Sequence, residues 1–157
     1  MRKLALLAAF AVVPLALAQD PTAAPAGTEA KAVATAPERT PSPASAEAYI
    51  ISPLDGATVK SPVIVRFGLK GMGIAPAGVK FENTGHHHLL IDTDAPADPG
   101  LPLPASDKIV HFGKGQSEAS VMLTQGKHTL QLLLGDQNHI PHNPPVMSKK
   151  ITITVVN

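Results

Sequence analysis

Two stretches of the chain alternate between apolar and polar residues, the pattern of a β-strand with one buried face. In residues 63–69 every second residue is apolar, and Arg66 lies on the other face. In residues 148–156 the apolar residues alternate in the same way with Lys150 and two threonines. Both stretches are predicted to be half-buried strands.

Five shorter segments also have strand character: residues 49–51, 86–92, 109–112, 118–123 and 128–134. The apolar residues of 86–92 fall on both phases, which is typical of a central strand buried on both faces. Clustered glycines and prolines separate these segments, and apolar residues are not spaced helically over three turns in any window. The sequence therefore predicts an all-β fold, an immunoglobulin-like antiparallel β-sandwich of about seven strands spanning residues 48–157.

The first 18 residues have the features of a secretory signal peptide. A short basic start containing Arg2 and Lys3 precedes an apolar run over residues 4–15, and residues 16–18 (Ala-Leu-Ala) match the small-residue cleavage pattern. The alternative, a retained membrane anchor, fits less well, because the run is short for a bilayer and no later segment is apolar for long enough. We expect an exported protein, periplasmic or secreted, with no transmembrane segment in the mature chain.

Residues 19–47 are rich in Ala and Pro and contain almost no large apolar side chain. Such a segment buries too little surface to offset the entropy lost on ordering, so we predict a disordered leader. It is either a tether that lets the domain stand off from a docking partner or a spacer needed only for export.

Charge and cysteine content narrow the possible partners. Without Arg2 and Lys3, 11 basic residues remain against 12 acidic ones, and the chain has one tyrosine and no tryptophan. This composition offers no basic surface for a phosphate backbone, so nucleic acid is not an expected partner. The absence of cysteine excludes disulfides, so the exported domain depends on its core or on a bound ion.

Five of the seven histidines fall in two short segments, residues 86–88 and residues 139–142. In an immunoglobulin-like sandwich, the second-to-third strand loop and the loop between the last two strands emerge at the same end. The two histidine segments are therefore predicted to meet there. His128 should lie at the opposite end, and His111 has no predicted place.

Imidazole is the commonest transition-metal ligand, so this meeting point predicts a metal site. His86 and His88 are two apart on a strand and share one face, whereas His87 points the other way. The predicted ligands of one copper or zinc ion are His86, His88, His139 and His142.

Other side chains near these segments are candidates for additional ligands, for residues that orient the ligands, or for packing. His87, Met72 and Met147 are possible additional ligands, although both methionines also suit rim or core packing. Asp136 and Asn138 are placed to orient imidazole protons from behind the ligands. In the competing interpretation, His86 and His88 are structural and hydrogen-bond to loop carbonyls.

The sequence resembles a family of exported bacterial proteins known as a domain of unknown function. The resemblance runs from Tyr49 to Val156 and rests on GMGIAPAG (71–78), GHHHLLID (85–92) and residues 130–146, which contain an HxPHxPPV run. It implies a bacterial, exported single domain and brings no established activity. The cupin fold, which also places His-x-His on a strand, fits less well because its further glycine, glutamate and histidine spacing is missing.

Three functions are compatible with these features. The first is a periplasmic metal-binding domain, with copper favoured, that handles or delivers the ion and is not an enzyme. The second is a cell-envelope interaction module that grips a protein or glycan and uses its histidines structurally. The third, a small metallohydrolase or oxidase, is weakest because no general base, nucleophile elbow or carboxylate pair is evident.

Overall fold

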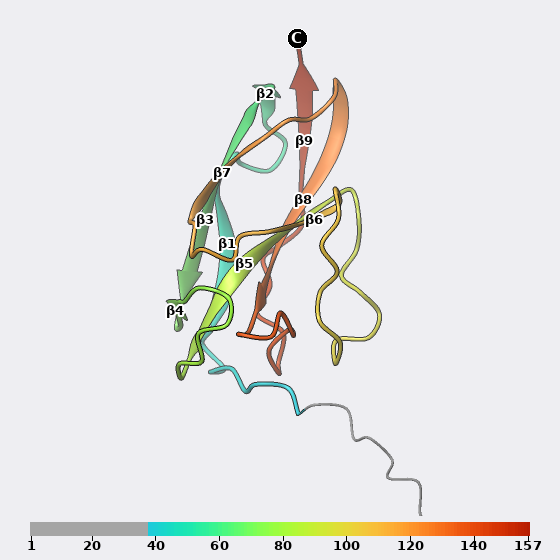
Figure 1. The fold of residues 1–157 in the computed structure, drawn as a ribbon. Coiled ribbons are helices and arrows are strands. Elements are labelled where there is room, and N and C mark those ends of the chain that lie inside the picture. Colours follow the sequence, from blue (N-terminus) through green and yellow to red (C-terminus); the bar gives the residue numbers. More distant parts are fainter. Residues whose placement is uncertain (1–37) are drawn as a thin grey trace, which may run out of the picture. The chain divides into compact units, whose positions relative to one another are not determined.

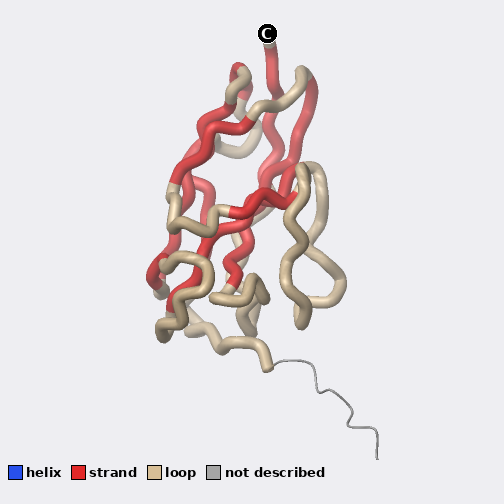
Figure 2. Tube along the Cα trace, viewed as in Figure 1, coloured by secondary structure: helices blue, strands red, loops and turns tan. Residues whose placement is uncertain are grey.

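The computed structural model describes residues 38–157, which form strands, turns and loops arranged as two sheets (Figures 1 and 2). The smaller sheet has the order β1-β3-β7, with bounds Glu47–Ser52 (β1), Val63–Lys70 (β3) and Glu118–Val121 (β7). The larger sheet has the order β2-β9-β8-β5-β4, and β6 also pairs with β5. Its bounds are Thr58–Lys60 (β2), Gly73–Ile74 (β4), Thr84–Ile91 (β5), Ile109–His111 (β6), Gly126–Gly135 (β8) and Ile151–Val156 (β9).

The predicted all-β sandwich is confirmed, with two strands more than the seven expected. The additional strands are β2, of three residues, and β4, of two residues. Both pair in parallel, β2 with β9 and β4 with β5, while every other pairing of strands is antiparallel. Segments this short show no alternation, so periodicity could not predict them. No helix in the part of the chain described here has the length and apolar character to cross a membrane.

The main core lies between the two sheets. Alternate residues of β3 (Val63, Val65 and Phe67) face alternate leucines of β8, and all of them are buried. Each buried side chain of this size contributes about 1.5–3 kcal/mol relative to an exposed one, so this layer accounts for much of the stability.

A second, smaller core covers the outer face of the larger sheet. Leu90 of β5, Leu133 of β8 and Ile109 of β6 pack there with Leu103 from the loop between β5 and β6. Because side chains alternate along a strand, His87, Leu89 and Ile91 point into the main core while His86, His88 and Leu90 point outward. The burial of β5 from Gly85 through Ile91 confirms the expectation of a central strand with two covered faces.

Residues 39–42, here called the strap, lie along residues 141–144 of the β8–β9 loop. Pro41 forms a parallel bridge with Asn143, whose N–H donates to the carbonyl oxygen of Thr40 at 2.9 Å. Arg39 donates through Nε to the carbonyl oxygen of Pro141 at 2.9 Å and through Nη2 to that of His142. The predicted signal peptide and residues 19–37 of the predicted leader lie outside the described residues, but the strap belongs to the same predicted leader and packs on the domain.

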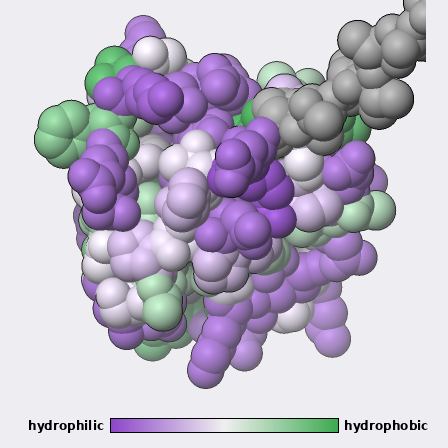
Figure 3. Space-filling model, turned by 90° about the horizontal axis from the view of Figure 1, so that it is seen from below, coloured by the Kyte–Doolittle hydropathy of each residue, from purple (hydrophilic) through white to green (hydrophobic). Residues whose placement is uncertain are grey.

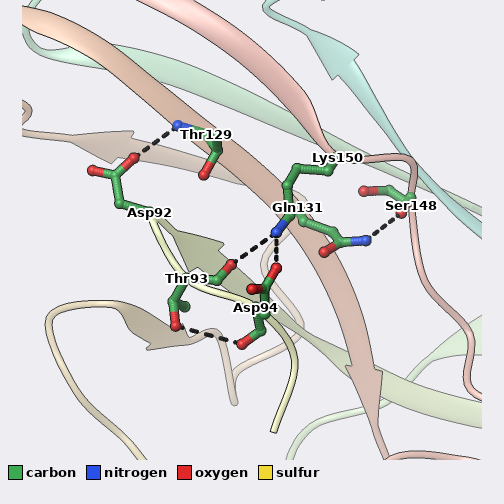
Figure 4. A network of polar contacts seen from close by, with 7 residues as sticks. All are labelled: Asp92, Thr93, Asp94, Thr129, Gln131, Ser148 and Lys150. Carbon is green, nitrogen blue, oxygen red and sulfur yellow. Dashed lines mark hydrogen bonds and ion pairs between the residues drawn. The ribbon is translucent and has the colours of Figure 1, made fainter.

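A polar network holds the other end of β8 (Figure 4). Asp92 accepts the Thr129 N–H at 2.7 Å, and Lys150 donates to the Thr93 carbonyl at 3.3 Å and to the Asp94 carboxylate.

His128 contacts Asp92 Oδ2 through Nδ1 at 2.7 Å and the Thr124 carbonyl through Nε2 at 2.9 Å. The Asp92 hydrogen bond raises the pKa of His128. Burial alone would raise the pKa of Asp92, but its bonds from His128 and Thr129 lower it.

The His128–Asp92 pair should make stability depend on pH in one window. A histidine whose pKa is raised on folding stabilises the folded state. This stabilisation is complete below the unfolded-state pKa of about 6.5, and it is lost as the pH rises through the higher folded-state pKa. We expect His128→Gln to lower the free energy of unfolding by up to about 1 kcal/mol at pH 5, since Asp92 is partly exposed. The loss should shrink by pH 9. Urea unfolding of both proteins at the two pH values measures this, and an equal loss at both would contradict it.

The strap contacts predict a difference between two N-terminal truncations. A fragment of residues 48–157 loses the strap hydrogen bonds, each worth about 1 kcal/mol before the entropy of ordering is subtracted. We expect it to melt several degrees below a fragment of residues 38–157 in thermal unfolding followed by circular dichroism. Equal melting temperatures would support the sequence-based boundary at residue 48.

Candidate metal centre

Four histidines gather on the outer face of the larger sheet, and we call them the histidine cluster: His86, His88, His111 and His139. Their six ring-centroid separations are 4.8 Å (86–88), 4.9 Å (86–111), 5.0 Å (86–139), 5.1 Å (88–111), 5.9 Å (88–139) and 4.6 Å (111–139). Every ring therefore neighbours the other three.

Strand pairing sets three of these positions. His86 and His88 share a face of β5 because they are two residues apart. The antiparallel pairing of β5 with β6 places His88 directly opposite His111. Directly opposed residues have Cβ atoms about 4.5–5.5 Å apart, so this register brings the imidazole of β6 to the pair on β5.

His139 reaches the cluster from the β8–β9 loop. Its backbone adopts φ 66°, a left-handed conformation that non-glycine residues seldom take. Its N–H donates to the Asp136 carbonyl and its carbonyl accepts the Leu103 N–H, both at 2.9 Å. These two bonds hold the loop so that the His139 ring lies over β5.

Two glycines provide the space that the rings occupy. A Cβ atom on Gly135 would lie 2.8 Å from Cε1 of His88, and one on Gly113 would lie 2.2 Å from Cε1 of His111. Both separations are far below van der Waals contact, so a larger residue at either position would displace a ring.

The cluster contains buried ring nitrogens without hydrogen-bond partners. In the cluster, both nitrogens of His86, both of His88 and Nε2 of His111 are in this state, and outside it Nδ1 of His87 and Nδ1 of His142 are as well. An unsatisfied buried polar group costs about 1–3 kcal/mol, so such groups are rare in proteins and require an explanation. Coordination of a metal ion provides one, since an imidazole nitrogen lone pair is a ligand.

The same surroundings keep the imidazoles neutral. Burial, together with the neighbouring histidines, lowers the pKa of His86 to about 4 and that of His88 to about 3. Burial, with His139 nearby, also lowers the pKa of His111. Only a neutral imidazole coordinates, so these side chains are in the ligand form at neutral pH.

The arrangement can hold a metal ion. One ring nitrogen from each of His86, His111 and His139 lies within 4.8 Å of the other two. The nitrogens of a tetrahedral zinc site, bound at about 2.0–2.1 Å, are about 3.3 Å apart, so small ring movements complete the site. His86 and His88 are buried, whereas His111 and His139 are partly exposed, which leaves one side of the cluster open to solvent.

Two of the predicted histidines lie elsewhere. His142 is buried, with Nε2 3.2 Å from the Thr84 carbonyl, and its ring faces the Cβ direction of Gly85. Gly85 shares its face of β5 with His87, so His142 lies on the face opposite His86. His87 points into the main core, with its ring centroid 5.2 Å from that of Phe67. The structure therefore does not bring His142 or His87 into the cluster.

The predicted accessory residues also have other contacts. Met72 packs against the main core and Met147 against the smaller one. Asp136 bonds to no imidazole: its carboxylate accepts the N–H groups of Asn138 and Ile140 at 2.8 and 3.0 Å. Asn138 contributes to this contact through its backbone N–H.

The sequence analysis did not identify His111 as part of the cluster. Its only signal is a histidine at the end of a weak strand, and its position depends on the register between β5 and β6.

The comparisons with known proteins identify a family and no activity. A family model described as Domain of unknown function (DUF4399) matches residues 65–156. None of the curated proteins matches the chain. The X-ray structure of the endo-beta-1,4-mannanase from Thermotoga petrophila is similar, with 22% sequence identity and a TM-score of 0.40. The match covers 71% of this chain and 20% of the mannanase chain, and at this level it carries no statement about function.

The unpartnered nitrogens predict that the cluster destabilises the metal-free domain. We expect His88→Leu to raise the free energy of unfolding by about 1 kcal/mol or more, because it removes buried polar atoms that have no partner. The matched control is His128→Leu, whose nitrogens are both bonded and whose loss should destabilise. Denaturant unfolding at pH 8 with a chelator measures both, and destabilisation by His88→Leu would contradict the prediction.

Proposed function

The chain belongs to the DUF4399 family of domains of unknown function, and from its structure we propose that it binds one divalent copper or zinc ion through the histidine cluster. The observation that carries the proposal is the convergence of four imidazoles: His86, His88 and His111 have buried nitrogens without partners, and one nitrogen from each of His86, His111 and His139 lies within 4.8 Å of the other two. The ligand set differs from the one expected from sequence by having His111 in place of His142.

The type of donor atom indicates which metal ions suit the proposed site. All four candidate donors are imidazole nitrogens, which suit zinc and copper, whereas magnesium and calcium prefer oxygen ligands. Met72 and Met147 both pack outside the cluster, so neither supplies the soft thioether ligand that favours copper(I).

The spacing of the rings favours a tetrahedral ion. Four imidazoles bound at about 2.0–2.1 Å to a tetrahedral ion have ring centroids about 5 Å apart in all six pairs. In a square plane, which copper(II) prefers, four separations are about 4.5 Å and two are about 6 Å. Five of the six observed separations lie between 4.6 and 5.1 Å, closer to the tetrahedron. Zinc is therefore the favoured occupant, although copper binds nitrogen sites more tightly in general.

The proposed role is handling or delivery of the ion in the periplasm or outside the cell, and not catalysis. The signal-like first 18 residues support the location. The partly exposed His111 and His139 support the role, since an ion held beside them is reachable from solvent and can be passed on.

The competing function, an envelope interaction module with structural histidines, has less support. Both ring nitrogens of His128 are bonded, and His87 and His142 each leave only Nδ1 buried without a partner, whereas His86 and His88 each leave both nitrogens in that state. The surface seen from below in Figure 3 is mostly hydrophilic, with hydrophobic side chains in separate groups. That face does not present the large continuous apolar patch that marks many interaction sites.

A titration with variants of three histidines tests the ligand set. The wild type should bind one zinc ion, and His111→Ala should lose more than about a hundredfold in affinity, because removing only a partner of a ligand already costs about 10–100-fold. His142→Asn should keep one ion, since asparagine can donate to the Thr84 carbonyl in place of the imidazole. His128→Gln is the distant control. Isothermal titration calorimetry with zinc and copper measures stoichiometry and affinity.

Two outcomes would contradict the proposal. Absence of stoichiometric binding by the wild type would favour the interaction module. Binding that survives His111→Ala but is lost in His142→Asn would restore the ligand set expected from sequence.

A further inference from the structure

Asp136 organises the loop that presents His139. Its side chain is 2% exposed, and Oδ1 accepts the N–H groups of both Asn138 and Ile140, the two neighbours of His139. Its backbone N–H donates to the Ile140 carbonyl at 2.9 Å, and its carbonyl accepts the His139 N–H. The loop therefore closes around Asp136 on both sides of the histidine.

The second carboxylate oxygen of Asp136 is held by the strap. Thr40 Oγ1 donates to Asp136 Oδ2 at 2.6 Å, which joins residues that are 96 positions apart in the chain. A hydrogen bond to a charged group is roughly twice as strong as a neutral one. It fixes the carboxylate rotamer and so directs Oδ1 at the two amides beside His139.

This restraint matters because His139 sits in an unfavourable backbone conformation. A left-handed φ in a non-glycine residue is unfavourable and persists only where the surrounding contacts hold it in place. Loss of the carboxylate restraint lets the loop relax toward ordinary φ values, which moves the ring away from His86 and His111.

We propose that Asp136 and Thr40 are positioning residues of the metal site, through which the strap holds His139 in its ligand position. The inference rests on the proposed function and deepens it: the segment upstream of β1 becomes part of the site without touching the ion. Groups behind a ligand typically change metal affinity by about 10–100-fold when removed.

The strap supplies a matched control. Ser42 Oγ donates to the Pro144 carbonyl at 2.7 Å, so it also ties the strap to the β8–β9 loop but does not contact Asp136. Ser42→Ala thus removes one strap-to-loop hydrogen bond and leaves the carboxylate alone. Thr40→Ser keeps the hydroxyl donor and serves as the rescue.

The test uses the full mature chain with zinc, measured by calorimetry at a temperature where circular dichroism shows each variant folded. Thr40→Val should bind zinc about tenfold more weakly, with Thr40→Ser and Ser42→Ala within about twofold of wild type. Asp136→Asn, which keeps the shape but loses the charge, should also weaken binding and covers the case in which Thr40→Val does not fold. Unchanged affinity in Thr40→Val, or an equal loss in Ser42→Ala, overturns the proposal.

Amide hydrogen exchange on metal-free protein separates this inference from the proposed function. Thr40→Val should speed exchange at Asn138 and Ile140, the amides bound to Asp136, and Ser42→Ala should not. If the wild type binds no zinc, the proposed function fails, while faster exchange at these two amides still supports the positioning of His139. Unchanged exchange at both amides overturns the positioning role, whatever the metal result.

Discussion

The position of β5 inside the larger sheet is the constraint on which the rest of the structure depends. β5 pairs with β8 along one edge and with β6 along the other, so its side chains can point only into the main core or toward the outer face. Its inward residues complete the sandwich, and its outward residues carry the first two imidazoles. The same pairing fixes His111 opposite His88. The main core and the candidate site therefore lie on opposite faces of β5.

The outer face of this sheet is covered, and that covering gives the imidazoles their properties. Leu103 and Met147 pack with Leu90, Ile109 and Leu133, and His86 and His88 are themselves buried. Burial lowers the pKa of both rings and leaves their nitrogens without partners. The domain therefore carries a cost that a bound ion would remove, as the proposed function requires.

The β8–β9 loop shows how few residues can separate a candidate ligand from a structural histidine. His139 and His142 are three positions apart, yet the left-handed turn at His139 and the bridge between Pro141 and Gly135 send them to opposite faces of β5. His139 joins the cluster, and His142 closes the end of the main core near Thr84. The strap runs along the outside of this loop and reaches Asp136, which connects the segment upstream of β1 to the geometry of the site.

The sequence by itself determined the features that depend on local alternation: seven of the strands of the sandwich, the burial of β5 on both faces, and the placing of His86 and His88 on one face with His87 on the other. Tertiary structure alone decided the rest. His111 became a neighbour of His88 through the register between two strands, which no local pattern encodes. His142 was separated from His139 by loop hydrogen bonds, and the strap was held by groups about a hundred residues away. Period-two alternation arises within one strand, whereas register and loop conformation arise from contacts between distant segments.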